Sequence, residues 1–340
     1  MKLFIHKLTH WEYWPFQVVY IPIYFLWIYY AIRSRTLFFF NTVNPTIKNG
    51  GFFNESKNDI YQLIPQQYYP KTYLINYRDS IEQVSTHSLT FPFIAKPDIG
   101  LRGSAVRRIH SLEDLKKYHT NAGFNYLLQE LIPFSNEIGI FYVRFPNEKQ
   151  GRITGIVSKE FMIITGDGKN TIENLIKLNP RYELQLNVLR KELGSKIYDI
   201  LPKGEIYNLV PFGNHSRGTK FVDISHQISE KLTQVIDAMC QQINGFYYGR
   251  MDLMYNTWEE LENGKNFMIV ELNGSASEPT HIYDPNHSIF FAWKEIARHI
   301  TYMFQIGQQN HTKGIPYLNH TEGMNEYHKH QEHFYKLTQI

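Results

Sequence analysis

Cysteine and net charge are both scarce in this sequence, and each shortage excludes a class of protein. Cys240 is the only cysteine among 340 residues, so no disulfide can form within the chain, which fits a reducing cytosol or a surface facing it. We expect Cys240 to be a small buried apolar residue. The formal net charge is only +3 and no dense stripe of lysine and arginine occurs, which argues against nucleic-acid binding. Hydrophobic residues make up 43%, so the chain can form a sizeable core and is not largely disordered.

Several familiar short motifs are also missing. The chain contains neither the Gly-Lys-Ser/Thr of a P-loop nor the glycine fingerprint of a dinucleotide-binding turn. No Ser/His/Asp or Cys/His signature of nucleophilic catalysis stands out. The His-x-His-x-x-His run at 328–333 could bind a metal, but a solvated tail is the expected interpretation. We find no internal repeat.

The N-terminal region contains a long uncharged run at residues 13–32. Twenty helical residues rise about 30 Å, roughly the thickness of a bilayer core. Aromatic residues lie near both ends, and Arg33 and Arg35 follow at once, which would leave the larger C-terminal part in the cytoplasm. We therefore expect a cytoplasmic protein associated with the inner face of the membrane through residues 13–32. The alternative is an aromatic helix packed on the following domain, and Pro15 and Pro22 argue against a straight span.

The remainder of the chain alternates short apolar runs with turn residues, which predicts an α+β protein whose sheets are covered on one side by helices. A turn-rich joint at 41–51 follows the apolar run. The patterns predict strands at 71–75, 91–96, 126–132, 138–144, 153–165, 246–255 and 266–273, and helices at 55–64, 111–120, 171–177, 181–193, 223–243 and 289–304.

These elements divide the chain into four expected parts. Residues 1–40 form the apolar membrane-associating segment, and residues 41–86 form a short segment before the main domain. The main domain spans 87–306, with a break between two subdomains near 130–137. Residues 307–340 form a polar, His-rich tail.

Polar side chains interrupt two of the expected apolar strands. Arg250 and Asp252 alternate along one strand, and Glu271 and Asn273 alternate along another, so each pair shares one face of its strand. Either acid taken alone would be a solvated strand face. If the two strands pair, however, two carboxylates and an amide converge beside Arg250. Such oxygens, together with substrate phosphates, are the ligands that Mg²⁺ prefers, and Arg250 could neutralise charge on a transferred phosphoryl group.

A lysine at the end of another expected strand precedes a glycine loop. Lys96 is followed by Gly100, Gly103 and Ser104. Glycines let backbone N–H groups approach phosphate oxygens, and a lysine adds a point charge. This arrangement is typical of a phosphate site, although most Gly-x-x-Gly-Ser segments are ordinary turns.

The strand that ends with Gln129, Glu130 and Ile132 could offer its backbone to the edge of adenine. Because Pro133 has no N–H, the N–H of Ile132 and the carbonyl of Glu130 are the candidate groups. Glu137 could accept hydrogen bonds from ribose hydroxyls. Taken in isolation, Glu130 and Glu137 would be surface charges.

In this order along the chain, from about residue 55 to residue 293, the pieces resemble the ATP-grasp superfamily. The chain looks like the ligase branch that contains D-alanine–D-alanine ligase. Residues 165–172 and 213–219 look more like the ATP-grasp domain of cyanophycin and glutathione synthetases. The resemblance implies two α+β subdomains that clamp ATP behind the apolar N-terminal helix. It also implies a Mg·ATP-dependent ligase that activates a carboxylate as an acyl phosphate and couples it to an amine or another nucleophile.

The resemblance further implies a role for each candidate residue. For ATP, Lys57 and Lys96 contact the phosphates, and the loop of Gly100, Gly103 and Ser104 folds over them. Adenine is held by Gln129, Glu130 and Ile132. The ribose is held by Glu137. For two Mg²⁺ ions, with Mn²⁺ as a substitute, Asp252 and Glu271 bind one and Glu271 with Asn273 the other. For the chemistry, Arg250 steadies the acyl phosphate and the oxyanion, Lys159 contacts phosphate, and Asn214, His215 and Arg217 border the acceptor or the γ-phosphate.

The sequence departs from this family pattern in two places. Gly-Ser-Ala-Ser-Glu-Pro-Thr follows Asn273 in place of the Ser-Pro-Gly-Met-Thr of D-alanine ligases, so D-alanine specificity is in doubt. The segment before Lys96 is too short for the α/β domain that usually precedes ATP-grasp and helps to bind the substrate. The class of substrate therefore stays open, and it could be a small molecule or a lipid-linked one. Two alternatives to a ligase also remain open: an ATP-grasp phosphotransferase acting on a hydroxyl, and a non-catalytic ATP-binding module at the membrane.

Overall fold

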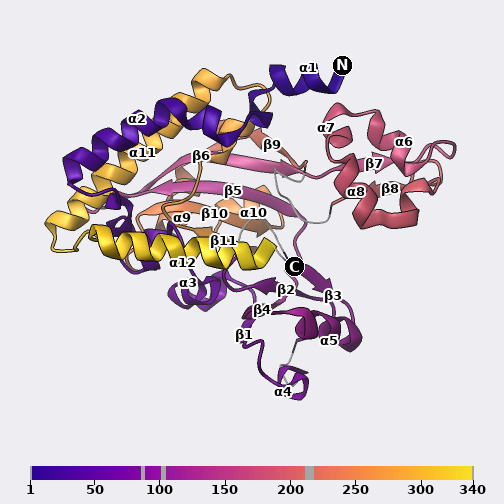
Figure 1. Cartoon of the computed structure of the whole chain (residues 1–340), viewed down its shortest axis with the longest axis horizontal. Helices are drawn as coiled ribbons and strands as arrows, with labels where there is room; N and C mark the ends of the chain where they lie inside the picture. Colours follow the sequence, from indigo (N-terminus) through magenta and orange to yellow (C-terminus); the bar gives the residue numbers. More distant parts are fainter. Residues whose placement is uncertain (1, 86–88, 101–104, 211–217, 339–340) are drawn as a thin grey trace.

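The computed structural model describes residues 2–85, 89–100, 105–210 and 218–338. Two antiparallel sheets dominate it, one of four strands in the order β1-β4-β2-β3 and one of five strands in the order β11-β10-β5-β6-β9 (Figure 1). A two-stranded ribbon, β7-β8, forms a third sheet. The expected α+β class and the apolar N-terminal helix are therefore confirmed.

The smaller sheet lies low in the view of Figure 1 and has its own hydrophobic core. The core residues Phe93, Ala95 and Leu128 come from its central strands and pack against Leu115 of helix α5. Ser111 caps that helix by accepting a hydrogen bond from the backbone of Asp114. Its elements are β1 (Thr72–Ile75), α4 (Ile81–Ser85), β2 (Phe93–Pro97), β3 (Arg107–Ile109), α5 (Leu112–Asn121) and β4 (Tyr126–Glu130).

The larger sheet buries both of its faces. Ile140 and its neighbours pack against helix α9, whereas Phe141, on the opposite face, packs with helix α11. The expectation that helices cover one side only is therefore wrong for this sheet, because alternate residues of its central strands are apolar on both faces. Its elements are β5 (Asn136–Val143), β6 (Arg152–Glu160), β9 (Lys220–Asp223), α9 (Glu230–Gln241), β10 (Tyr248–Tyr255), β11 (Phe267–Asn273) and α11 (Ile289–Thr312).

The long helix expected at 223–243 begins later than predicted. Residues before it form strand β9, in which Phe221 pairs with Lys159 of β6. Helix α9 starts only after Ser229, whose side chain accepts a hydrogen bond from the backbone of Leu232 at 3.0 Å. Cys240 lies in this helix, buried and free, as expected.

A separate lobe connects β6 to β9 and lies at the right of Figure 1. It has its own small hydrophobic core, which includes Met162, Ile176 and Leu189. Its elements are β7 (Ile163–Thr165), α6 (Ile172–Lys177), α7 (Pro180–Glu183), α8 (Leu186–Leu193) and β8 (Ile206–Asn208). The remaining short helices of the main body are α3 (Lys57–Leu63) and α10 (Trp258–Glu262).

The uncharged run forms most of α2 (Phe16–Ser34), which follows α1 (Lys2–Thr9) and lies beside α11 (Figure 1). Trp293 of α11 donates to the carbonyl of Val19 at 2.7 Å, and Tyr30 stacks on Phe304 with ring centroids 4.2 Å apart. Helix α2 is long and apolar enough to cross a membrane, but a core helix or a signal sequence fits the same measure. One stripe of α2 is thus packed on the protein while its remaining apolar side chains are exposed.

The C-terminal region differs from the solvated tail expected after residue 306. Helix α11 continues to Thr312, with Ile306 and Asn310 buried, and a further helix, α12 (His320–Thr338), packs back on the protein. Asn310 donates to the carbonyl of Thr42 at 2.8 Å. Glu326 of α12 accepts a hydrogen bond from Asn49 at 3.1 Å. This region therefore contains a docked helix, because Glu326 accepts hydrogen bonds from Asn49 and Asn54.

Candidate active site

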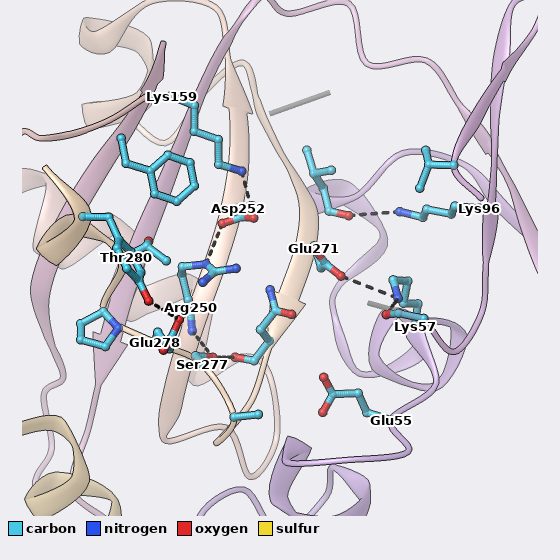
Figure 2. Close-up of a pocket in the computed structure, with 18 of the residues that line it drawn as sticks. Glu55, Lys57, Lys96, Lys159, Arg250, Asp252, Glu271, Ser277, Glu278 and Thr280 are labelled. Carbon is cyan, nitrogen blue, oxygen red and sulfur yellow. Dashed lines mark hydrogen bonds and ion pairs between the residues drawn. The ribbon is translucent and has the colours of Figure 1, made fainter. Parts of the chain in front are cut away.

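A cavity of about 2190 Å³ lies between the two large sheets. Lys96 and Gln129 line it from the smaller sheet, and Arg250, Asp252 and Glu271 line it from the larger one. In Figure 2, Lys96 lies on one side of the cavity, and Arg250 and Asp252 lie on the other. A single cleft therefore collects most of the residues that the sequence singled out.

The pairing of β10 with β11 brings the predicted polar set onto one face. Asp252 lies opposite Glu271, and Arg250 lies opposite Asn273. Residues that face each other directly in an antiparallel pair project to the same side of the sheet. On the other side of β10, Asp252 lies opposite Gly139, where a Cβ atom would approach the Asp252 carboxylate to 3.1 Å. Because Gly139 has no side chain, the Asp252 carboxylate has room at this position.

Two cations hold the Asp252 carboxylate. The Nε of Arg250 donates to it at 3.0 Å and the Nζ of Lys159 at 3.1 Å. Burial disfavours the charged carboxylate, but these two cations outweigh that effect, so the pKa of Asp252 lies below its usual value. Asp252 is therefore held as an anion at the centre of the cavity wall.

Lys159 neutralises a second buried acid, Glu137, with which it forms a close ion pair. Burial favours the neutral amine, yet the carboxylates of Asp252 and Glu137 together raise the pKa of Lys159 above its usual value. The pKa of Glu137 is raised by burial, with Lys159 only partly opposing that shift. In this structure the carboxylate of Glu137, which is predicted to hold ribose, forms an ion pair with Lys159.

Lys57 connects the larger sheet to the start of the glycine loop. Its Nζ lies 3.7 Å from the carboxylate of Glu271 and donates to the carbonyl of Gly100 at 3.0 Å. The candidates Gly103, Ser104, Asn214, His215 and Arg217 lie outside the described residues.

Lys96 is a buried cation that faces the cavity. Its Nζ donates to the hydroxyl of Tyr61 and to Oε1 of Gln129, both at 2.8 Å, and to the carbonyl of Val270 at 3.2 Å. Burial lowers the pKa of Lys96 to about 8. Among the described residues no carboxylate forms an ion pair with it. Lys96 therefore offers the cavity a positive charge that an anionic ligand can neutralise.

Gln129, predicted to hold adenine, lines the cavity and hydrogen-bonds to two other side chains. Its side chain is buried, and its amide bridges Lys96 to the hydroxyl of Thr72, 2.8 Å away. Glu130 and Ile132, at the crossing from β4 to β5, do line the cavity. The apolar side chains of Ile94 and Met254 line it from opposite sheets.

Four polar residues of the site are not marked by any of the sequence patterns above. Ser277 accepts a hydrogen bond from the backbone of Arg250 at 3.1 Å and donates to the carbonyl of Asn273 at 2.7 Å. Glu278 accepts hydrogen bonds from two tyrosines, and Tyr61 contacts Lys96. The pKa of the fourth residue, Glu55, is raised by burial to about 7. The Gly-Ser-Ala-Ser-Glu-Pro segment could have pointed to Ser277 and Glu278, because it directly follows Asn273.

The donor set fits magnesium bound together with a phosphate ligand. Asp252, Glu271 and Asn273 supply carboxylate and amide oxygens on one face, the type of ligand that Mg²⁺ takes. Within the described ranges, no three His, Cys, Asp or Glu side chains form a closed metal cluster. A metal held here would therefore take part of its coordination from substrate oxygens.

No protein-family model and no curated protein matches this sequence. Among solved structures, the chain is similar to a bifunctional glutathione synthetase from Pasteurella multocida, with a TM-score of 0.39 and 15% identity over 73% of this chain and 35% of that one. It is similar to D-alanine–D-alanine ligase from Bacillus anthracis, with a TM-score of 0.45 and 12% identity over 76% of this chain and 69% of that one. For the same ligase complexed with ATP, the TM-score is 0.43 and the identity 12%, over 76% and 68%. Because similarity at this level does not carry an activity from one protein to another, function has to be inferred from the side chains of the site.

Proposed function

We propose that this protein is a Mg·ATP-dependent ligase of the ATP-grasp type, which activates a carboxylate as an acyl phosphate and joins it to an amine or another nucleophile. One observation carries the proposal. Four cations, Lys57, Lys96, Lys159 and Arg250, surround a cavity whose wall also presents Asp252 and a second carboxylate, that of Glu271. A site of this composition suits a polyphosphate and a divalent metal together.

ATP would lie with its base at the crossing between the sheets and its phosphates at the lysines. The backbone of residues 130–132 lines the cavity and can pair with the edge of adenine, while Ile94 and Met254 can contact the two faces of the ring. Lys96 is held in place by Tyr61 and Gln129, so its ammonium is already oriented toward the phosphates.

The proposed reaction has two steps. An oxygen of the substrate carboxylate attacks the γ-phosphorus, and the bond from that phosphorus to the β-bridging oxygen breaks, which releases ADP. An amine then attacks the acyl carbon of the acyl phosphate, the carbon–oxygen bond to phosphate breaks, and the amine proton is lost. Arg250 would stabilise the oxyanion of the second step, and Lys96 and Lys57 would neutralise the phosphates during the first. Bound magnesium would supply further charge neutralisation at Asp252, Glu271 and Asn273.

Substituting the two carboxylates tests this proposal. Asp252→Asn and Glu271→Gln keep the side-chain shape but remove the charges, and each is expected to lower turnover at least a hundredfold, as loss of comparable electrostatic groups does. Glu160→Gln, at the exposed end of β6, is the matched control and should retain full activity. Melting curves establish that each variant folds. Near-normal turnover of both site variants would contradict the proposal.

Product analysis separates a ligase from a phosphotransferase. The purified protein would be incubated with Mg·ATP and panels of amino acids, hydroxy acids and alkyl carboxylates. A ligase yields an amide or ester together with ADP and free phosphate. A stable phosphorylated product without free phosphate would indicate transfer to a hydroxyl instead.

A further inference from the structure

The cavity continues beyond the polar site into a space between helices α2 and α11. We call this part the apolar branch. Six apolar side chains of the two helices border it, and five of these are buried in the protein, the exception being the partly buried Trp27. The six are Val19, Ile23 and Trp27 of α2 and Ile296, Ile300 and Met303 of α11. The same two helices also line the cavity with Phe16, Tyr20, Tyr24 and His299. The six apolar side chains favour contact with an apolar ligand.

A short polar junction separates the apolar branch from the charged site. Glu278 accepts hydrogen bonds from Tyr20 of α2 and from Tyr283, the latter at 3.1 Å. The neighbouring Ser277 contacts the backbone of Arg250. Figure 2 shows Ser277 and Glu278 next to Arg250. A ligand that extends along the branch would therefore bring one end to Arg250.

The cavity is larger than a nucleotide alone would fill. Pockets for single drug-sized ligands measure roughly 300–1,000 Å³. This cavity measures about 2190 Å³, so it has space for ATP and for a second substrate of considerable length. Because the six side chains that define the apolar branch are all apolar, that substrate is expected to be amphipathic.

The face of α2 that points away from the branch is also apolar. Val18, Ile21, Phe25, Ile28 and Ile32 recur at helical spacing and are 45%, 53%, 72%, 52% and 72% exposed. Glu12 is the only acidic residue before Glu55, whereas Arg33 and Arg35 end the helix. This apolar and weakly basic surface suits an anionic lipid bilayer, in which a long-chain substrate would be dissolved.

We propose, on the basis of the function proposed above, that the carboxylate substrate carries a hydrocarbon chain, which occupies the apolar branch while its carboxylate lies at Arg250. The positive guanidinium matches the negative head, and the buried aliphatic side chains match the chain. Helix α2 thus forms one wall of the substrate site.

The test measures binding of straight-chain alkanoates, from butanoate to dodecanoate, by calorimetry without ATP. Affinity is expected to rise about fourfold with each added methylene until the branch is filled. Ile300→Trp fills the branch and Ile23→Asn makes it polar, so each should weaken dodecanoate binding at least tenfold and leave butanoate binding unchanged. Phe25→Ser, on the exposed face of α2, is the matched control and should bind like the parent protein.

Affinity that does not increase with chain length in the parent protein would overturn the inference, and this outcome does not depend on whether a variant folds. Alkylamines that bind with this chain-length dependence while alkanoates do not would also overturn it. Binding is measured without turnover, so the two proposals can fail separately. If alkanoate affinity rises with chain length but the protein forms no acyl phosphate, the apolar branch would still be supported as a binding site, and only the ligase proposal would be wrong.

Discussion

Lys96 shows how a single residue is prepared for an anion. Its ammonium has three hydrogen-bond partners, two of them neutral side chains and one a backbone carbonyl. These contacts orient the charge without cancelling it. Burial makes the charge costly, and the lowered pKa of Lys96 reflects this cost, which bound phosphate would relieve.

The affinity for ATP should therefore depend on pH through Lys96. The pKa of Lys96 is about 8, so the amine is charged below that pH and neutral above it. Metal-free ATP affinity should fall about tenfold between about pH 7 and about pH 9, since binding requires the charged form. Lys96→Arg, which stays charged, should remove most of this dependence. Calorimetric titrations across the pH range measure the effect, and an equal fall in both proteins would contradict the assignment.

Lys159 has a different task, because it neutralises two buried carboxylates. Lys159→Met leaves Glu137 without its cation and Asp252 with Arg250 alone. The unfolding free energy should fall by about 3–5 kcal/mol, the usual cost of an uncompensated buried charge. Adding Glu137→Gln should restore part of the loss, because it removes one of the two negative charges. Urea unfolding of the single and double variants measures both unfolding free energies. Equal values for the two variants would contradict the expected partial restoration.

At the scale of elements, helix α2 has two apolar faces with different surroundings. One face contacts α11 through the hydrogen bond from Trp293 and the stacking of Tyr30 on Phe304. The other face has no covering element among the described residues. A helix that packs sideways on its own domain cannot cross a bilayer without leaving that contact. If α2 binds a membrane while it is packed on α11, it would therefore lie along the membrane surface.

The exposed face of α2 should decide membrane binding. A triple substitution of Phe25, Ile28 and Ile32 by serine is expected to lower binding to phosphatidylglycerol vesicles at least tenfold, because each buried apolar side chain contributes about 1.5–3 kcal/mol. Co-sedimentation measures it. Leu178→Ser, at an exposed apolar residue in the separate lobe, is the control and should bind vesicles like the parent protein. The melting temperature of the triple variant should equal that of the parent protein. Unchanged sedimentation of the triple variant would exclude this face as the anchor.

At the scale of the whole molecule, the two ends of the chain close around the cavity. Helix α12 contacts the segment after α2 through Glu326, and the ring of His333 hydrogen-bonds to the carbonyl of Ile99 at 3.0 Å. Helix α2 and η8 (Thr280–Tyr283) contribute further lining residues. The cavity is therefore lined by elements from nearly the full length of the chain.

This arrangement predicts that Mg·ATP stabilises the whole fold. Binding to the folded state alone raises the unfolding free energy by about 2.7 kcal/mol at a ligand concentration of about one hundred times Kd. The melting temperature should rise by several degrees. The rise should be much smaller for Asp252→Asn, or for ATP with a chelator. Equal shifts with and without magnesium would show that the two carboxylates bind no metal with ATP.

Local patterns in the sequence determined the polar face of the site. Alternation along single strands was enough to place Arg250 with Asp252, and Glu271 with Asn273, since successive side chains of a strand point to opposite faces. The helical spacing of apolar residues predicted most helices, and the uncharged run predicted the N-terminal one. These features depend on residues close together in sequence.

Only the tertiary structure decided which distant groups meet. It placed Lys159 between Glu137 and Asp252, and it brought Gln129 within hydrogen-bond distance of Lys96. It also docked α12 and aligned α2 with α11, which creates the apolar branch. The physical reason is that strand order and helix packing depend on contacts between residues far apart in the chain, whereas periodicity reports only the face on which a residue lies.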